Sequence, residues 1–127
     1  MTSPESPLEQ IDRVLDRDAA LTFVGHDPGF LNELLDSFHD YRQGIVSRIE
    51  EAVKSGDASE VCEATHQLRG ALGNFHARAA VTTTLELEDL GHENNLQDAE
   101  DLCATLNEEL NILCDCVGKL VDELNAE

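Results

Sequence analysis

The sequence has few aromatic residues: no tryptophan, one tyrosine and four phenylalanines among 127 residues. Sheets favour aromatic and β-branched side chains, whereas the Leu, Ala and Glu that abound here favour helices. Only three prolines and eight glycines interrupt the chain, so long helical stretches are available. The composition therefore predicts helices rather than sheets.

Basic residues are also scarce, with eight Lys and Arg against 27 Asp and Glu, for a formal net charge of −19. Such a surface repels nucleic acids and anionic lipids, so no nucleic acid and no membrane is an expected partner. Apolar residues still make up 41% of the chain, too many for a disordered tail. A single domain with a real core is expected.

A signal peptide and long apolar runs are absent, which predicts a cytoplasmic protein. The initial Met and the length of one domain favour a free-standing chain over a domain cut from a larger protein. No C-x-x-C pair is present, so neither a zinc knuckle nor a thioredoxin-like motif is supported and no metal is expected. Reduced, half-buried thiols are expected at the four cysteines, which are Cys62, Cys103, Cys114 and Cys116.

Apolar residues recur at intervals of three and four, the spacing of one helix face. After a flexible lead over residues 1–7, the pattern predicts a short helical region ending near Gly25 and then four helices. These run from Pro28 to the Ser55-Gly56-Asp57 break, and over about 58–75, 78–90 and 98–124. Gly91 is expected to stop the third of them. The short connections predict an all-α domain over residues 8–127, an up-down antiparallel four-helix bundle with an additional short N-terminal helical region.

One window differs from the rest of the chain. Residues 64–85 contain no Asp or Glu, although more than one residue in five of the whole chain is acidic. The window holds His66, Arg69, His76 and Arg78 instead. Such a window indicates a local site that tolerates or attracts negative charge, although a buried helix that needs fewer charges would look the same.

Helix geometry places His66 away from the core. At about 100° per residue, it lies opposite a stripe made of Val61, Thr65, Leu68, Leu72 and Phe75. The outer face around it is predicted to carry Cys62, Arg69, Gly70, Gly73 and Ala77. Because these side chains have little bulk, another protein could come close there; close helix packing is the alternative reason for the glycines. A neutral imidazole is a competent nucleophile, and Arg69 could pair with phosphate oxygens.

The segment over residues 65–75, THQLRGALGNF, resembles the H-x-L-K/R-G signature of histidine-containing phosphotransfer (HPt) domains. The helix pattern around it is also similar to that family, so the resemblance covers roughly Ile11 to Leu124. One position departs from it, because members often have glycine where this chain has His76. We expect His76 to lie at a helix end with its side chain turned outward.

The resemblance implies a role for each matching residue. His66 matches the histidine that is phosphorylated on Nε2, Arg69 matches a basic residue near the phosphoryl group, and Gly70 matches a glycine that leaves room for a receiver domain. Glu88, 22 positions after the histidine, matches a residue that accepts a hydrogen bond from the histidine Nδ1 in several relatives. It would orient His66, although a surface glutamate is the alternative reading.

The function implied by the resemblance is reversible phosphoryl transfer in a multistep two-component phosphorelay. His66 takes a phosphoryl group from a receiver-domain aspartate and passes it to another receiver. The expected partners are response-regulator receiver domains, a hybrid histidine kinase, or both. The receiver supplies Mg²⁺, so the chain needs no cofactor of its own, and no kinase activity is expected because a nucleotide-binding loop is missing. Cys62, Gly70, Gly73 and Ala77 are the candidate receiver-docking residues.

Two other functions fit parts of the sequence. A bundle of this kind could dock a receiver or a kinase without relaying phosphate. Alternatively, Glu63 and His66 form an E-x-x-H pair, which carboxylate-bridged di-iron bundles use. Those bundles need a second such pair facing inward, and the nearest candidates begin with Asp36 and Asp89 rather than glutamate.

Overall fold

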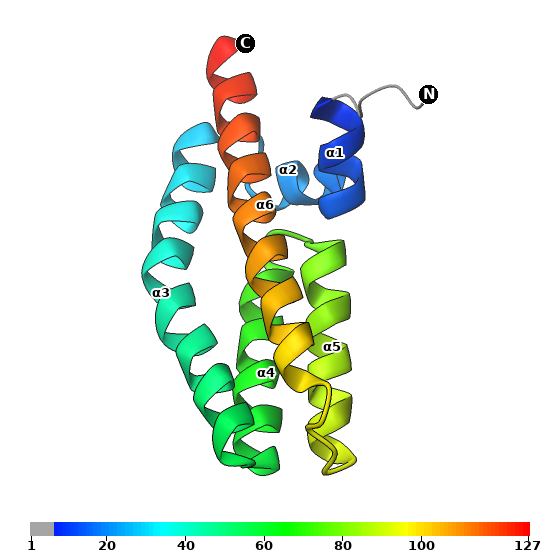
Figure 1. Cartoon of the computed structure of the whole chain (residues 1–127). Helices are drawn as coiled ribbons and strands as arrows, with labels where there is room; N and C mark the ends of the chain where they lie inside the picture. Colours follow the sequence, from blue (N-terminus) through cyan, green and yellow to red (C-terminus); the bar gives the residue numbers. More distant parts are fainter. Residues whose placement is uncertain (1–6) are drawn as a thin grey trace, which may run out of the picture.

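The computed structural model describes residues 7–127 as helices joined by short turns, with side chains described from Ile11 onward (Figure 1). Six helices follow one another in the described part of the chain. They are α1 (Pro7–Val14), α2 (Arg17–Phe23), α3 (Pro28–Ser55), α4 (Ala58–Gly73), α5 (Arg78–His92) and α6 (Ala99–Ala126). None of them is long and apolar enough to span a membrane.

The last four helices form the predicted up-down antiparallel bundle. Helix α3 packs against α4 and α6, and α5 packs against the same two neighbours. The bundle encloses side chains with at most 1% of their surface exposed, among them Ile49, Leu68, Leu87, Leu106 and Leu110. The all-α fold class is therefore confirmed.

The two short N-terminal helices compensate for unequal helix lengths. Helices α3 and α6 have 28 residues each, whereas α4 and α5 have 16 and 15. At 1.5 Å per residue, the long pair extends about 18 Å further than α4. Helices α1 and α2 lie beside the C-terminal part of α6, which extends beyond α5 (Figure 1), and Ile11, Leu15 and Leu21 are buried there. Without them, the apolar face of α6 beyond α5 would meet water.

Aspartate side chains cap three helices. Asp16, Asp27 and Asp57 precede α2, α3 and α4, and each carboxylate accepts a hydrogen bond from a first-turn amide at 2.9–3.1 Å. Gly56 ends α3 with a left-handed φ of +74°, a conformation that costs glycine little. The helix boundaries predicted at Asp27-Pro28 and Ser55-Gly56-Asp57 are thus confirmed. The aspartate caps and the left-handed glycine are their physical cause.

Two expectations from the sequence change at the chain's beginning and after α5. The lead predicted over residues 1–7 lies outside the described residues except for Pro7, which begins α1. Gly91 does not stop α5, because the helix continues to His92. Gly91 is buried instead, and a Cβ there would lie 2.7 Å from Cys62 Sγ and 3.0 Å from the Ala58 carbonyl oxygen. The residue is a close contact between α5 and α4 rather than a stop signal.

All four thiols are free, and three of them are buried in α6 rather than half-buried. Burial, with Glu50 and Glu100 nearby, raises the pKa of Cys103 to about 11 from 9.0. The thiolate is the form of cysteine that attacks alkylating reagents. We therefore expect Cys103 in the folded protein to react about a hundredfold more slowly at neutral pH than a cysteine whose pKa is 9.0. Mass spectrometry after timed iodoacetamide treatment measures the rate. Equal labelling of Cys103 in folded and urea-unfolded protein would contradict the expectation.

Candidate functional site

The outward orientation of His66 follows from the rest of α4. The predicted core stripe is buried, with Val61, Leu68 and Leu72 all fully enclosed. The imidazole of His66 projects from the opposite side of the helix, and 70% of its side-chain surface is exposed. The sequence-based placement of His66 on the outer face is confirmed.

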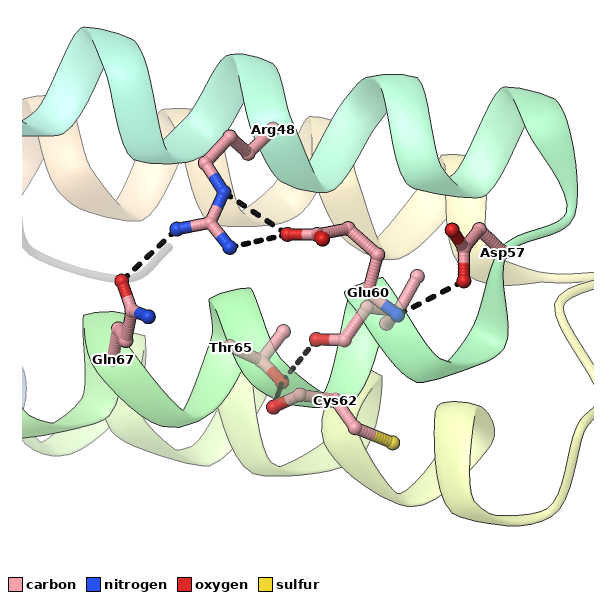
Figure 2. A network of polar contacts seen from close by, with 7 residues as sticks. Arg48, Asp57, Glu60, Cys62, Thr65 and Gln67 are labelled. Atoms are coloured by element: carbon pink, nitrogen blue, oxygen red, sulfur yellow. Dashed lines mark hydrogen bonds and ion pairs between the residues drawn. The ribbon is translucent and has the colours of Figure 1, made fainter.

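A polar network fixes the rotation of α4 against α3 (Figure 2). Arg48 of α3 donates two hydrogen bonds through Nε and Nη2 to one carboxylate oxygen of Glu60, the first at 3.0 Å, and an Nη1 hydrogen bond of 2.9 Å to Gln67. Glu60 and Gln67 lie two turns apart on α4. A single guanidinium therefore holds two points of the helix on either side of His66 in sequence, and a rigid helix places its nucleophile reproducibly.

Three side chains meet behind the imidazole. Arg69 Nη2 lies 2.9 Å from His66 Nδ1, and Glu88 Oε2 lies 3.5 Å from the same nitrogen. Arg69 Nη1 and Glu88 Oε1 are also 3.5 Å apart, so the three groups form a closed set of contacts. The site residues predicted from separate helices, His66 and Arg69 on α4 and Glu88 on α5, thus lie together around one ring nitrogen.

Glu88 reaches this position because α4 and α5 approach closely. Its side chain is only 11% exposed, against 35% for Arg69. Figure 2 shows the Cys62 side chain pointing from α4 toward α5, where its thiol lies 3.7 Å from the Glu88 carbonyl oxygen. One turn further along α5, Gly91 allows the same approach. The carboxylate therefore lies under His66, largely shielded from water, and among the described residues it is the acidic group in contact with the ring.

The small-residue face beside His66 is only partly as predicted. Gly70 and Gly73 are exposed, and a Cβ at either would meet nothing within 4 Å. Ala77 does not belong to this face, because only 3% of its surface is exposed. Helix α4 ends at Gly73, so the projection of its outer face does not extend to Ala77, which pairs with Leu15 through backbone hydrogen bonding just before α5. The predicted placement of Ala77 on the outer face is therefore wrong.

His76 lies in the turn between α4 and α5, exposed as predicted. Its φ of +51° is in the left-handed region that favours glycine, in keeping with the glycine that the resemblance implies there. Its ring packs edge-on against Phe23 of α2 at 6.2 Å between centroids. Its acidic neighbour is Asp16, which also pairs with Arg78 at 3.5 Å.

The sequence did not identify an apolar groove on the α3 side of the His66 face. Its volume is about 180 Å³, and Phe38, Tyr41, Ala71, Asn74 and Phe75 contribute to its walls. Tyr41 is 37% exposed, and Phe30 and Phe23 are more exposed still. In the sequence, Phe30 and Tyr41 cannot be told from core residues, because both continue the helical spacing of the buried positions in α3.

The di-iron alternative finds no support in the geometry. Glu63 is exposed and His66 points outward, whereas such a centre needs both to face the core. Among the residues whose side chains are described, no three His, Cys, Asp or Glu side chains gather as metal ligands would.

Comparisons with known proteins agree with this geometry. The family model of the Hpt domain matches residues 31–116. The fold is similar to that of the crystal structure of histidine-containing phosphotransfer protein B (HptB) from Pseudomonas aeruginosa PAO1, with a TM-score of 0.76. That match has 21% sequence identity and covers 86% of this chain and 95% of the other. No curated protein matches the sequence significantly.

The matched range contains α4, α5 and most of α3 and α6, and with them His66, Arg69 and Glu88. Hpt domains pass phosphoryl groups to receiver domains in two-component systems. An exposed histidine on a four-helix bundle, and a match over more than half of the chain, show that this protein belongs to the Hpt domain family and has a histidine phosphotransfer role in a phosphorelay.

Proposed function

We propose that His66 is the phosphoryl acceptor of this Hpt domain and that it reacts through Nε2. The observation that carries the proposal is the contact set at Nδ1: Arg69 and Glu88 engage that nitrogen from below, and 70% of the side chain stays exposed. The opposite nitrogen, Nε2, is then the one that an approaching protein can reach. Among the residues whose side chains are described, no carboxylate forms such an ion pair with the ring of His26, His39 or His92.

The reaction is an in-line displacement. The Nε2 lone pair forms a bond to phosphorus while the bond between phosphorus and the receiver's aspartate oxygen breaks, and the electron pair leaves with the aspartate carboxylate. The ring keeps its proton on Nδ1 and gains a positive charge, which the Glu88 carboxylate offsets. The second transfer reverses these events on another receiver, so His66 is unchanged after one cycle.

Most of the catalysis in such a transfer is positioning and charge stabilisation. Arg69 is within one helix turn of His66 and can donate to phosphoryl oxygens, while the receiver brings the Mg²⁺ and its own acidic residues. Cys62, Gly70 and Gly73 line the face where the receiver docks, with the apolar groove by Tyr41 at its edge. The proposed partners are response-regulator receivers, a hybrid histidine kinase or both, in the cytoplasm, where thiols stay reduced.

The test is transfer from a phosphorylated receiver with Mg²⁺ present. We expect an acid-labile, base-stable label on this chain, the stability pattern of phosphohistidine, and mapping of the label to His66. A bundle that only docks receivers would bind the phosphorylated receiver and remain unlabelled, so binding without labelling supports the alternative function.

Gly70 offers a test of the docking face. Because nothing lies within 4 Å of a Cβ there, Gly70→Leu should fold as well as the native protein and should add a side chain where the receiver must approach. We expect about tenfold or more weaker receiver binding, equivalent to roughly 1–3 kcal/mol of overpacking. Titration calorimetry against a receiver measures it. Gly44→Leu, at an equally open and exposed position of α3, is the matched control. Equal affinity of the two variants would remove Gly70 from the docking face.

A further inference from the structure

The contacts at His66 Nδ1 contain a conflict between two partners. A guanidinium can only donate hydrogen bonds, and a carboxylate can only accept them. Nδ1 cannot satisfy both at once, because it carries either a lone pair or a proton. Of the two distances, the 2.9 Å from Arg69 Nη2 is that of a hydrogen bond, whereas the 3.5 Å from Glu88 Oε2 is longer than a good one. In this arrangement Nδ1 therefore accepts from Arg69.

The position of the ring proton follows from that contact. When Nδ1 of a neutral imidazole accepts a hydrogen bond, the single ring proton is on Nε2. A protonated Nε2 has no free lone pair and cannot attack phosphorus. The arrangement around unphosphorylated His66 thus masks the nitrogen that the proposed function requires.

The same contacts show how the mask is removed. Arg69 is held on its other side by Glu88, at 3.5 Å between Nη1 and Oε1, and its side chain is 35% exposed. A partly exposed ion pair of this length is weak and easily exchanged. A phosphoryl group offers three anionic oxygens to the guanidinium, and bidentate hydrogen bonds to phosphate are among the strongest that arginine makes. Its arrival beside His66 gives Arg69 a better partner within reach.

We propose that Arg69 is a positioning residue that holds His66 in its non-nucleophilic tautomer until an incoming phosphoryl group draws the guanidinium away and leaves Nδ1 to Glu88. The inference rests on the proposed function of His66 and names its regulation. The exposed ring loses the Nε2 proton to water and takes one from water on Nδ1, so its charge does not change. Nδ1–H then donates to Glu88, and Nε2 is free to attack.

This device has a consequence for a chain that waits between partners. Without a phosphoryl group nearby, Arg69 and Glu88 neutralise each other and the nucleophile is masked. With one nearby, Arg69 pairs with the phosphoryl oxygens and Glu88 pairs with the ring proton. The nucleophile is therefore activated only beside a phosphorylated receiver.

The proton can be located directly by nitrogen NMR of ¹⁵N-histidine-labelled, unphosphorylated full-length protein, at a pH high enough for the imidazole to be neutral. We expect the native protein to carry the His66 proton on Nε2. Arg69→Met keeps the length of the side chain and removes the donor. Of the described partners of Nδ1, Glu88 then remains, and the proton should move to Nδ1 as the major form. Arg78→Met, at an exposed arginine of the same acid-free window that does not contact His66, should leave the proton on Nε2.

Glu88 can be tested in the same spectra. Adding Glu88→Leu to Arg69→Met removes the acceptor that favours Nδ1–H, so the Nδ1–H form should lose its excess. A native protein with the proton on Nδ1, or an Arg69→Met protein with the proton still on Nε2, would overturn the inference. Neither measurement needs a receiver. Failure of the proposed function appears separately, as absence of label on His66 in the transfer assay.

Discussion

His66→Gln is expected to abolish phosphoryl transfer to this chain while leaving its fold intact. Glutamine has no nucleophilic nitrogen, so no covalent intermediate can form and the label should fall below detection. Because 70% of the His66 side chain is exposed, the free energy of unfolding should change by no more than about 0.5 kcal/mol. The measurement is transfer of labelled phosphoryl from a receiver, alongside thermal unfolding of the same sample.

The matched control is His76→Gln. His76 is also exposed and lies in the acid-free window, and its ring packs edge-on against Phe23. Its variant should accept label at the native rate. Label that survives His66→Gln, or that disappears only in the His76 variant, would show that the site is assigned to the wrong histidine.

The sequence predicted the position of His66 because one helix determines it. Helical spacing alone separates the buried stripe from the outer face, and the buried Leu68 and Leu72 match that separation. The capped starts of α3 and α4 could also be predicted, because an aspartate before a helix acts through local hydrogen bonds. Features that depend on three or four consecutive turns of one helix can therefore be predicted from the sequence alone.

Features that depend on the packing of two helices cannot be predicted from the sequence in this way. Glu88 was predicted to lie near His66 only because its position relative to the histidine matches one in the HPt family. Nothing in the sequence of α5 itself indicates which of its glutamates faces α4. Ala77 was misplaced because the projection of α4 was continued beyond the end of the helix. Tyr41 follows the spacing of the buried positions in α3 and is nevertheless 37% exposed, because spacing defines a helix face but not how far a neighbouring helix covers it. Packing decides each of these positions.

Gly91 is the residue at which the two kinds of information conflict most clearly. Glycine after an apolar run is typical of a helix end, which is how the sequence was interpreted. Here the glycine is buried inside α5, facing the Cys62 thiol and the Ala58 carbonyl oxygen of α4. A side chain at this position has to displace backbone atoms of the neighbouring helix.

We therefore expect Gly91→Val to destabilise the protein by about 1–3 kcal/mol, the usual range for overpacking a tight contact. Chemical denaturation followed by circular dichroism measures the change. The control is Gly118→Ala in α6, where a Cβ would meet nothing within 4 Å. Alanine is favoured over glycine within a helix, so this variant should gain about 0.5–1 kcal/mol. Opposite signs at two helical glycines separate close packing from helix propensity, and a stabilised Gly91→Val would contradict the contact between α5 and α4.

The same variant links packing to chemistry. Glu88 lies one turn before Gly91 on α5. Pushing α5 away from α4 should lengthen the distance between the Glu88 carboxylate and His66 Nδ1, now 3.5 Å. Under conditions where Gly91→Val remains folded, its transfer rate should fall below that of the native protein, whereas the rate of Gly118→Ala should not change. A Gly91→Val protein that is destabilised yet transfers phosphoryl at the native rate would show that the α4–α5 spacing serves stability alone.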